Sequence, residues 1–142
     1  MSGQGPFEFL LLGMVEEAQK FKRSLRHAID GICYAVCHEK NFRTEIALAI
    51  IVIVFILFFK VKNWEAIILV LMIMWVLILE LINTVVERVV DILKPRIHPY
   101  ARLIKDLMAA VVLISSIMAI IIGIIIFYPY FRDLAIALLL PS

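Results

Sequence analysis

Three long apolar stretches, separated by short charged segments, dominate the pattern of this chain. They lie at residues 44–61, 64–90 and 104–128. A helix needs about 20 apolar residues to cross a hydrocarbon core about 30 Å thick, so each stretch is predicted to be a spanning helix. The uncharged part of the first stretch, 46–59, has only 14 residues. It reaches spanning length only if Lys60 and Lys62 extend their ammonium groups to the interface, and a re-entrant segment is the alternative.

A fourth segment, residues 20–38, has apolar and basic positions that repeat with the period of a helix. One face is apolar and carries Phe21, Leu25, Ala28, Ile29, Ile32 and Val36. A helix with basic side chains around such a face is predicted to lie in the membrane interface, near anionic headgroups. A soluble helix packed on the others is the alternative. Residues 1–19 and 132–142 are predicted to be peripheral ends.

Composition and charge place these helices in a membrane. The chain of 142 residues is 64% hydrophobic, well above the half that is usual for soluble domains. Its length allows one all-α domain, 1–142. Eleven of the 14 basic residues flank one side of the predicted spans, and Lys60, Lys62 and Arg132 lie on the other. The N-terminus and the loop 91–105 are therefore predicted to be cytoplasmic.

The second apolar stretch contains a stripe of polar residues. Glu80, Asn83, Glu87 and Asp91 follow one another at steps of three and four, which place them on one face of a helix. A carboxylate at membrane depth is costly, so Glu80 indicates a function. One chain is predicted to have too few helices to shield Glu80 from lipid, which favours an oligomer.

Other chemically active residues collect at the same end of the predicted bundle. Carboxylates suit Mg²⁺ bound together with phosphates, and Lys or Arg suit a polyphosphate. A further carboxylate can accept a proton from a lipid hydroxyl. This combination favours phosphoryl transfer from a nucleotide to a membrane alcohol, although the chain contains neither a Walker A motif nor a kinase Gly-rich loop.

Two other classes of function remain open on the residues alone. Glu80 could serve a proton or cation conductor, or a structural network between subunits. Asn83 could form a hydrogen bond between helices, and the negative charge of Asp106 could stabilise a helix N-terminus. Arg88 and Lys94 could serve only to orient the chain in the membrane.

The motifs HEKNFRTE, ELINTVVERVVD and HPYARLIKDLMAAVVL resemble the small bacterial membrane lipid kinases, the prokaryotic diacylglycerol kinase and undecaprenol kinase family. The resemblance covers about residues 20–127. It implies a homotrimer whose active sites are shared between subunits in the bacterial cytoplasmic membrane. It also implies ATP- and Mg²⁺-dependent phosphorylation of the primary hydroxyl of undecaprenol or diacylglycerol, with a lean toward undecaprenol. The expected partners are ATP, the lipid alcohol and the bilayer, with no nucleic acid.

The resemblance also implies roles for individual residues. Glu80 is expected to be the general base, and Glu39 and Glu87 the metal ligands. The expected nucleotide-binding residues are Lys20, His27, Asn83, Asp91, Arg96, His98, Lys105 and Asp106. The expected lipid-side residues are Asn41, Phe42, Arg43, Glu45 and Ala109. Lys20 and His27 depart from the family pattern, since they replace a frequent Arg and a frequent Tyr.

Overall fold

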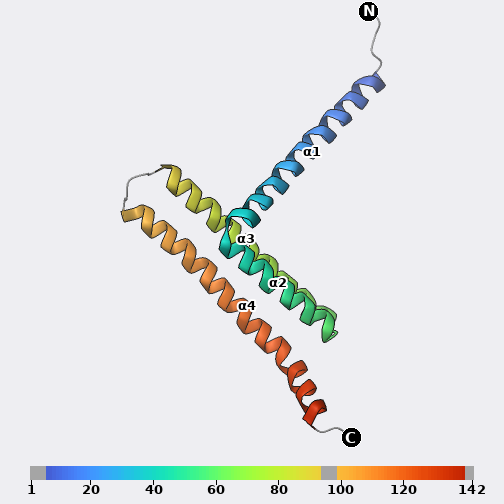
Figure 1. Ribbon diagram of the computed structural model, residues 1–142. Coiled ribbons are helices and arrows are strands. Elements are labelled where there is room, and N and C mark those ends of the chain that lie inside the picture. Colours follow the sequence, from blue (N-terminus) through green and yellow to red (C-terminus); the bar gives the residue numbers. More distant parts are fainter. Residues whose placement is uncertain (1–5, 94–98, 140–142) are drawn as a thin grey trace, which may run out of the picture. The chain divides into compact units, whose positions relative to one another are not determined.

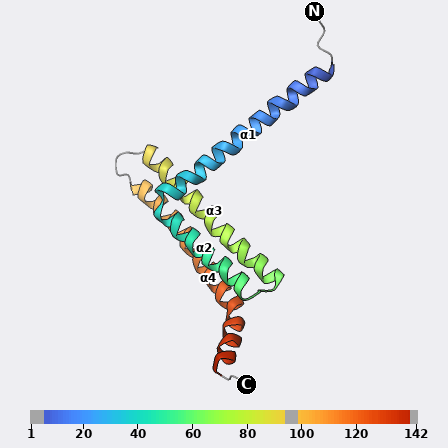
Figure 2. The same cartoon turned by 45° about the vertical axis from the view of Figure 1, so that its right-hand side comes forward.

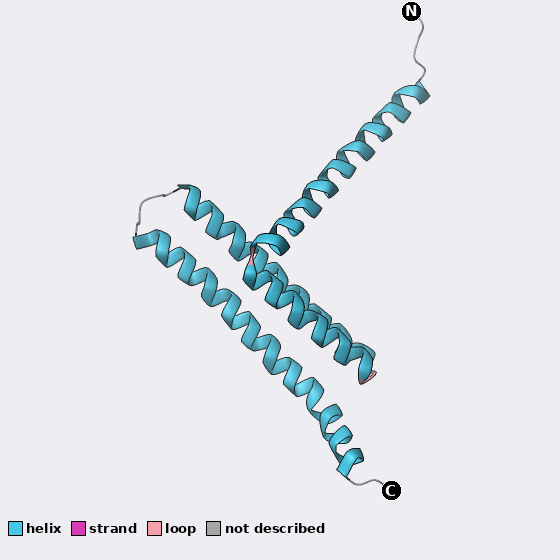
Figure 3. Ribbon diagram, in the orientation of Figure 1, coloured by secondary structure: helices cyan, strands magenta, loops and turns pink. Residues whose placement is uncertain are grey.

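A computed structural model describes residues 6–93 and 99–139. It contains four helices, α1 (Pro6–His38), α2 (Lys40–Phe58), α3 (Asn63–Leu93) and α4 (Pro99–Leu139) (Figure 1). Every regular element among the described residues is helical (Figure 3), so the all-α prediction is confirmed. The chain divides after His38 into two compact units, α1 and the part that contains α2, α3 and α4.

Three of the helices are long and apolar enough to cross a membrane, in agreement with the number of predicted spans. The first of them, α2, has 19 residues and therefore a length of about 28 Å. It is longer than the uncharged run because the polar residues from Lys40 onward are already helical. An unbroken helix of this length supports a span rather than a re-entrant segment.

The helix boundaries differ from the predicted ones at both ends of the chain. Residues 6–19 continue the helix that was expected to begin at Lys20, so α1 has 33 residues. At the other end, α4 runs past the expected boundary at residue 128 and includes Pro129. A proline removes one backbone hydrogen bond from a helix, but the ring of Phe131 packs on Phe55 of α2 and that of Tyr130 on Phe59, the C-cap of α2. This packing favours continuing the helix. The interfacial location of α1 and the single-domain assignment stay predictions.

In the second unit, α3 packs against both α2 and α4 (Figure 2). The apolar core lies at one end of this bundle, where Val61 and Leu69 are buried against Ile126 and Phe127. Aromatic rings add edge-on contacts there, with centroids 5.8 Å apart for Phe55–Phe127 and 4.8 Å apart for Phe59–Phe131. We call this region the aromatic end. The opposite region, with the start of α2, the end of α3 and the start of α4, is the Glu80 end.

The turn between α2 and α3 has the hydrogen bonds of a Schellman motif. The N–H of Val61 donates to Ile56 O over 3.2 Å, and the N–H of Lys60 donates to Leu57 O over 3.4 Å. Lys60 has a φ of 48°, in the left-handed region, which costs a non-glycine residue roughly 1–2 kcal/mol. Burial of Val61 in the core helps to offset this cost. The turn therefore directs the chain back along α2 without a glycine.

A buried carboxylate, Glu65, also lies at the aromatic end. The Tyr130 hydroxyl donates to Glu65 Oε2 over 2.5 Å and accepts from the Lys62 backbone N–H over 3.3 Å. This contact joins the start of α3 to α4. The sequence does not reveal this contact, because the two side chains lie 65 positions apart and no local spacing connects them.

Candidate active site

The polar stripe of α3 is buried within the single chain. Glu80 is 3% exposed and Asn83 is 6% exposed. The Glu80 carboxylate lies within electrostatic range of Glu39, Glu45 and Glu87, and within hydrogen-bonding reach of the Asn41 side chain. The expectation that one chain cannot shield Glu80 is therefore wrong, because α2 supplies Asn41 and Glu45 to cover it.

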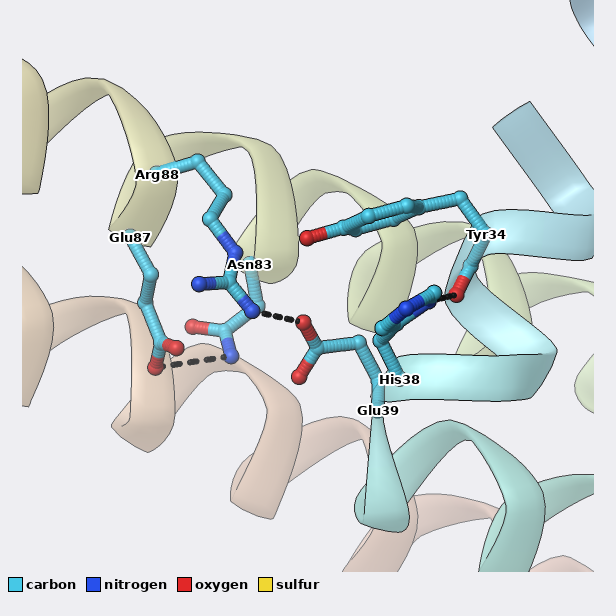
Figure 4. Close-up of polar contacts among 6 residues, drawn as sticks. All are labelled: Tyr34, His38, Glu39, Asn83, Glu87 and Arg88. Carbon is cyan, nitrogen blue, oxygen red and sulfur yellow. Dashed lines mark hydrogen bonds and ion pairs between the residues drawn. The ribbon is translucent and has the colours of Figure 1, made fainter. Parts of the chain in front are cut away.

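Asn83 and Glu87 form a local pair on α3. Asn83 Nδ2 donates to Glu87 Oε1 over 3.3 Å, as helical neighbours four positions apart can (Figure 4). The other amide atom, Asn83 Oδ1, is buried and accepts no hydrogen bond from the described residues. Buried acceptors are usually satisfied. An oxygen in this state beside a carboxylate is a suitable ligand for a bound cation.

Glu39 connects the start of α2 to α3. It occupies the N-cap position of α2, yet its side chain makes no capping hydrogen bond. Its Oε1 instead accepts from Arg88 Nη2 over 2.5 Å (Figure 4). Both expected metal ligands, Glu39 and Glu87, therefore lie in the carboxylate cluster around Glu80.

A second ion pair joins α3 to α4 at the Glu80 end. Lys105 Nζ lies 2.6 Å from Asp91 Oδ1, and both residues were expected to bind the nucleotide. Asp106, the next residue on α4, is exposed. Arg96 and His98, expected on the nucleotide side, lie outside the described residues.

The two remaining nucleotide candidates belong to α1. Lys20 forms an exposed ion pair with Glu16 at 2.9 Å, and His27 is exposed. The last turns of α1 also carry a stacked pair of rings, Tyr34 and His38, with centroids 4.4 Å apart (Figure 4). Because α1 is a separate unit, the roles of Lys20 and His27 stay predictions.

The expected lipid-side residues occupy the first turns of α2. Phe42 is buried, Asn41 and Arg43 are exposed, and Glu45 is half-buried. Glu45 lines a cavity of about 480 Å³ between α2, α3 and α4, where it faces Ser116. Ala109 is exposed on α4 and is not among the lining residues. The rest of the lining is mostly apolar and includes Val52, Phe55, Val76, Leu77, Ile120 and Phe127.

The oxygen atoms around Glu80 are of the chemical type that binds hard cations. Within residues 6–93 and 99–139, no three His, Cys, Asp or Glu side chains are close enough together to hold a metal ion. Mg²⁺ seldom needs such a set, because it usually binds one or two carboxylates and takes its other ligands from phosphates and water. Glu39, Glu87 and Asn83 Oδ1 are oxygen groups of the kind that such a site would use, and their role as ligands stays a prediction.

Comparison with known proteins connects this site to a family. The family model described as prokaryotic diacylglycerol kinase matches residues 26–127. This range contains all of the expected site residues except Lys20. Glu80 and its neighbouring carboxylates therefore lie inside the matched region.

Three curated proteins are similar over most of the chain. An undecaprenol kinase of Bacillus subtilis is 34% identical over 113 residues, which cover 80% of this chain and 92% of that protein. A diacylglycerol kinase of Synechocystis sp. is 35% identical over 101 residues, or 70% of this chain and 58% of that protein. A diacylglycerol kinase of Helicobacter pylori is 33% identical over 104 residues, or 71% and 81% of the two chains.

Proposed function

Since the chain belongs to the prokaryotic diacylglycerol kinase family and is a multi-pass membrane lipid kinase, we propose that it uses ATP and Mg²⁺ to phosphorylate a membrane lipid alcohol. The reaction takes place at the Glu80 end, which faces the cytoplasm. Membership of a kinase family sets aside the two alternatives, an ion conductor and a purely structural oligomer.

The observation that carries this proposal is the burial of Glu80 among other carboxylates at one end of the bundle. Glu80 accepts the proton of the primary hydroxyl as its oxygen attacks the γ-phosphorus. The bond from the γ-phosphorus to the bridging oxygen breaks, and ADP leaves with that oxygen. The proton ends on Glu80, and Asn41 is within reach to orient the carboxylate. General-base help of this kind contributes roughly 10²–10⁴-fold to a rate.

Other residues of the cluster hold the nucleotide. Glu39, Glu87 and Asn83 Oδ1 would hold Mg²⁺, which supplies charge neutralisation at the β- and γ-phosphates when it is bound. Lys105, kept in place by Asp91 at 2.6 Å, provides a positive charge for the phosphates at the start of α4. The proposal therefore assigns the nucleotide to the side of the cluster formed by α3 and α4.

The cavity between α2, α3 and α4 supports a location for the lipid. Its lining is mostly apolar, and Glu45 and Ser116 form a polar end toward the carboxylate cluster. Ligand sites commonly combine an apolar cleft with a few such polar groups. One hydrocarbon chain of the alcohol would lie in this cavity, with its hydroxyl toward Glu80.

We favour undecaprenol over diacylglycerol as the alcohol. The undecaprenol kinase of B. subtilis aligns over 92% of its own length, against 58% and 81% for the two diacylglycerol kinases named above.

A direct test uses the purified chain in lipid nanodiscs with Mg²⁺ and γ-labelled ATP, with either alcohol added. We expect labelled undecaprenyl phosphate to form faster than labelled phosphatidic acid. Absence of any labelled lipid with both alcohols would overturn the proposal.

The cytoplasmic orientation can be tested with the chain's own cysteines. Cys33 and Cys37 are both exposed on α1. A membrane-impermeant maleimide should label them in inside-out membrane vesicles and leave them unlabelled in intact spheroplasts. The opposite pattern would reverse the proposed orientation.

A further inference from the structure

Arg88 lies at the edge of the carboxylate cluster and has no role in the reaction described so far. It follows Glu87 on α3, and its Nη2 donates to Glu39 Oε1 over 2.5 Å (Figure 4). Glu39 is also a proposed metal ligand. A cationic side chain of the protein therefore occupies one oxygen of this proposed ligand.

Neither helix capping nor the stability of the fold accounts well for this ion pair. An N-cap side chain commonly accepts a hydrogen bond from the first turn of its helix, but Glu39 extends toward α3 instead. The Arg88 side chain is 51% exposed and the Glu39 side chain is 19% exposed, and an ion pair that solvent reaches from one side contributes only modestly to folding. The contact is better explained by charge balance in the cluster.

The negative charge of the cluster favours a cation at this place. Glu39, Glu45 and Glu87 all lie within electrostatic range of Glu80, and like charges at such range destabilise each other. Arg88, which is paired with Glu39, offsets part of this charge. A divalent cation bound at Glu39 would take over that task and would repel the guanidinium.

A phosphate group is a suitable new partner for the displaced guanidinium. Arginine presents a planar fork of donors that matches the oxygens of a phosphate group. Because Arg88 contacts Glu39 directly, it remains beside any phosphate that shares a metal ion with Glu39. The phosphate would arrive together with the cation that releases Arg88.

We propose that Arg88 is a phosphate-binding residue that exchanges partners. It holds Glu39 in the metal-free chain, and it binds a phosphate oxygen of the nucleotide when the metal–nucleotide complex enters. This inference rests on the proposed kinase function and adds a residue to its nucleotide site. It differs from the simpler hypothesis that Arg88 only orients the chain in the membrane.

The test measures binding rather than turnover, with the full chain in nanodiscs. Binding of Mn²⁺ alone is followed by electron paramagnetic resonance, and binding of a non-hydrolysable ATP analogue with Mg²⁺ by calorimetry. Arg88→Gln should tighten Mn²⁺ binding about two- to fivefold, because a competing cation is lost. It should weaken binding of the analogue about tenfold, because a charge-assisted hydrogen bond is lost. Arg88→Lys keeps the charge but lacks the planar fork of donors. Its binding constants for Mn²⁺ and for the analogue should lie between those of the unmodified chain and those of Arg88→Gln.

Arg102→Gln is the matched control, since it removes an exposed positive charge from α4 at the same end of the bundle. It should change neither binding constant. Changes of the same sign in both constants for Arg88→Gln, or no change in either, would overturn the exchange of partners. Tighter Mn²⁺ binding with unchanged binding of the analogue would overturn the phosphate contact. If the unmodified chain bound no Mg²⁺–nucleotide at all, the kinase proposal would fall together with this inference.

Discussion

At the scale of single residues, the carboxylates of the site differ in their hydrogen-bond partners. Glu39 and Glu87 each have one oxygen engaged, by Arg88 and by Asn83. Such contacts hold the side chains of Glu39 and Glu87 in place at the cluster, and the Arg88 contact is the one that we propose to open when the metal–nucleotide complex enters. Glu80 is more deeply buried, and the Asn41 side chain is the group among the described residues that lies within hydrogen-bonding reach of it. This difference in surroundings agrees with different tasks for Glu80 and for its neighbours.

Glu87→Gln tests the assignment of the metal ligands. The amide keeps a coordinating oxygen but loses the charge, so we expect the Mg²⁺ concentration for half-maximal rate to rise about tenfold or more, as for weakened metal sites generally. The rate at saturating Mg²⁺ should change less. The measurement is a Mg²⁺ titration of lipid phosphorylation, with Asp133→Asn at the aromatic end as the control. An unchanged Mg²⁺ requirement would remove Glu87 from the metal site.

At the scale of helices, α3 is the central element because both α2 and α4 pack on it. The aromatic end holds the three helices together through ring contacts and the Tyr130–Glu65 hydrogen bond. The Glu80 end is joined mainly by ion pairs, Glu39–Arg88 and Asp91–Lys105. Apolar packing holds the aromatic end together, and the Glu80 end is polar. This arrangement suits an enzyme whose substrates must enter on one side.

Tyr130→Phe tests the contribution of the aromatic end to stability. The substitution leaves the buried Glu65 carboxylate without its donor, which costs about 1–3 kcal/mol of the free energy of unfolding. Thermal unfolding in detergent should show a lower midpoint than for the unmodified chain. Tyr128→Phe removes an exposed hydroxyl from the same helix and should leave the midpoint unchanged. A midpoint for Tyr130→Phe equal to that of the control would show that the hydrogen bond adds nothing.

How far the sequence predicts this structure depends on how far apart the interacting residues lie. The Glu80–Asn83–Glu87 stripe follows from helical periodicity, and the three spans follow from apolar length. The contacts Glu39–Arg88 and Glu65–Tyr130 join residues 49 and 65 positions apart. No periodicity encodes such pairs, since they depend on how the helices pack. The continuation of α4 through Pro129 was missed for a similar reason: local propensity favours a break, and packing overrides it.

At the scale of the whole molecule, shielding of Glu80 no longer explains why the chain would assemble, because one chain already buries it. Small residues give a different reason. Ala109 and Ala110 are exposed on α4 near the Glu80 end, and small side chains let helices of neighbouring subunits approach closely. We therefore keep the proposal of a homotrimer and assign its contact to this face of α4.

Native mass spectrometry from mild detergent tests this assignment. The unmodified chain should have a mass three times that of one chain. Ala110→Leu should shift most of the protein to smaller species, because the larger side chain separates the helices. Ile114→Leu places the same side chain at an exposed position of the same helix without adding volume, so it should leave the trimer intact. A monomeric unmodified chain, or a trimer insensitive to Ala110→Leu, would contradict the assignment.

The most direct test of the central claim is the rate of lipid phosphorylation by Glu80→Gln, beside Glu65→Gln as a second buried carboxylate of the same helix. Glutamine fits the same space but cannot take the proton, so we expect Glu80→Gln to lose a factor of roughly 10²–10⁴ in rate. Its oligomer and its binding of the ATP analogue should persist. Glu65→Gln should keep most of the activity. A Glu80→Gln variant that phosphorylates lipid at nearly the unmodified rate would contradict the account.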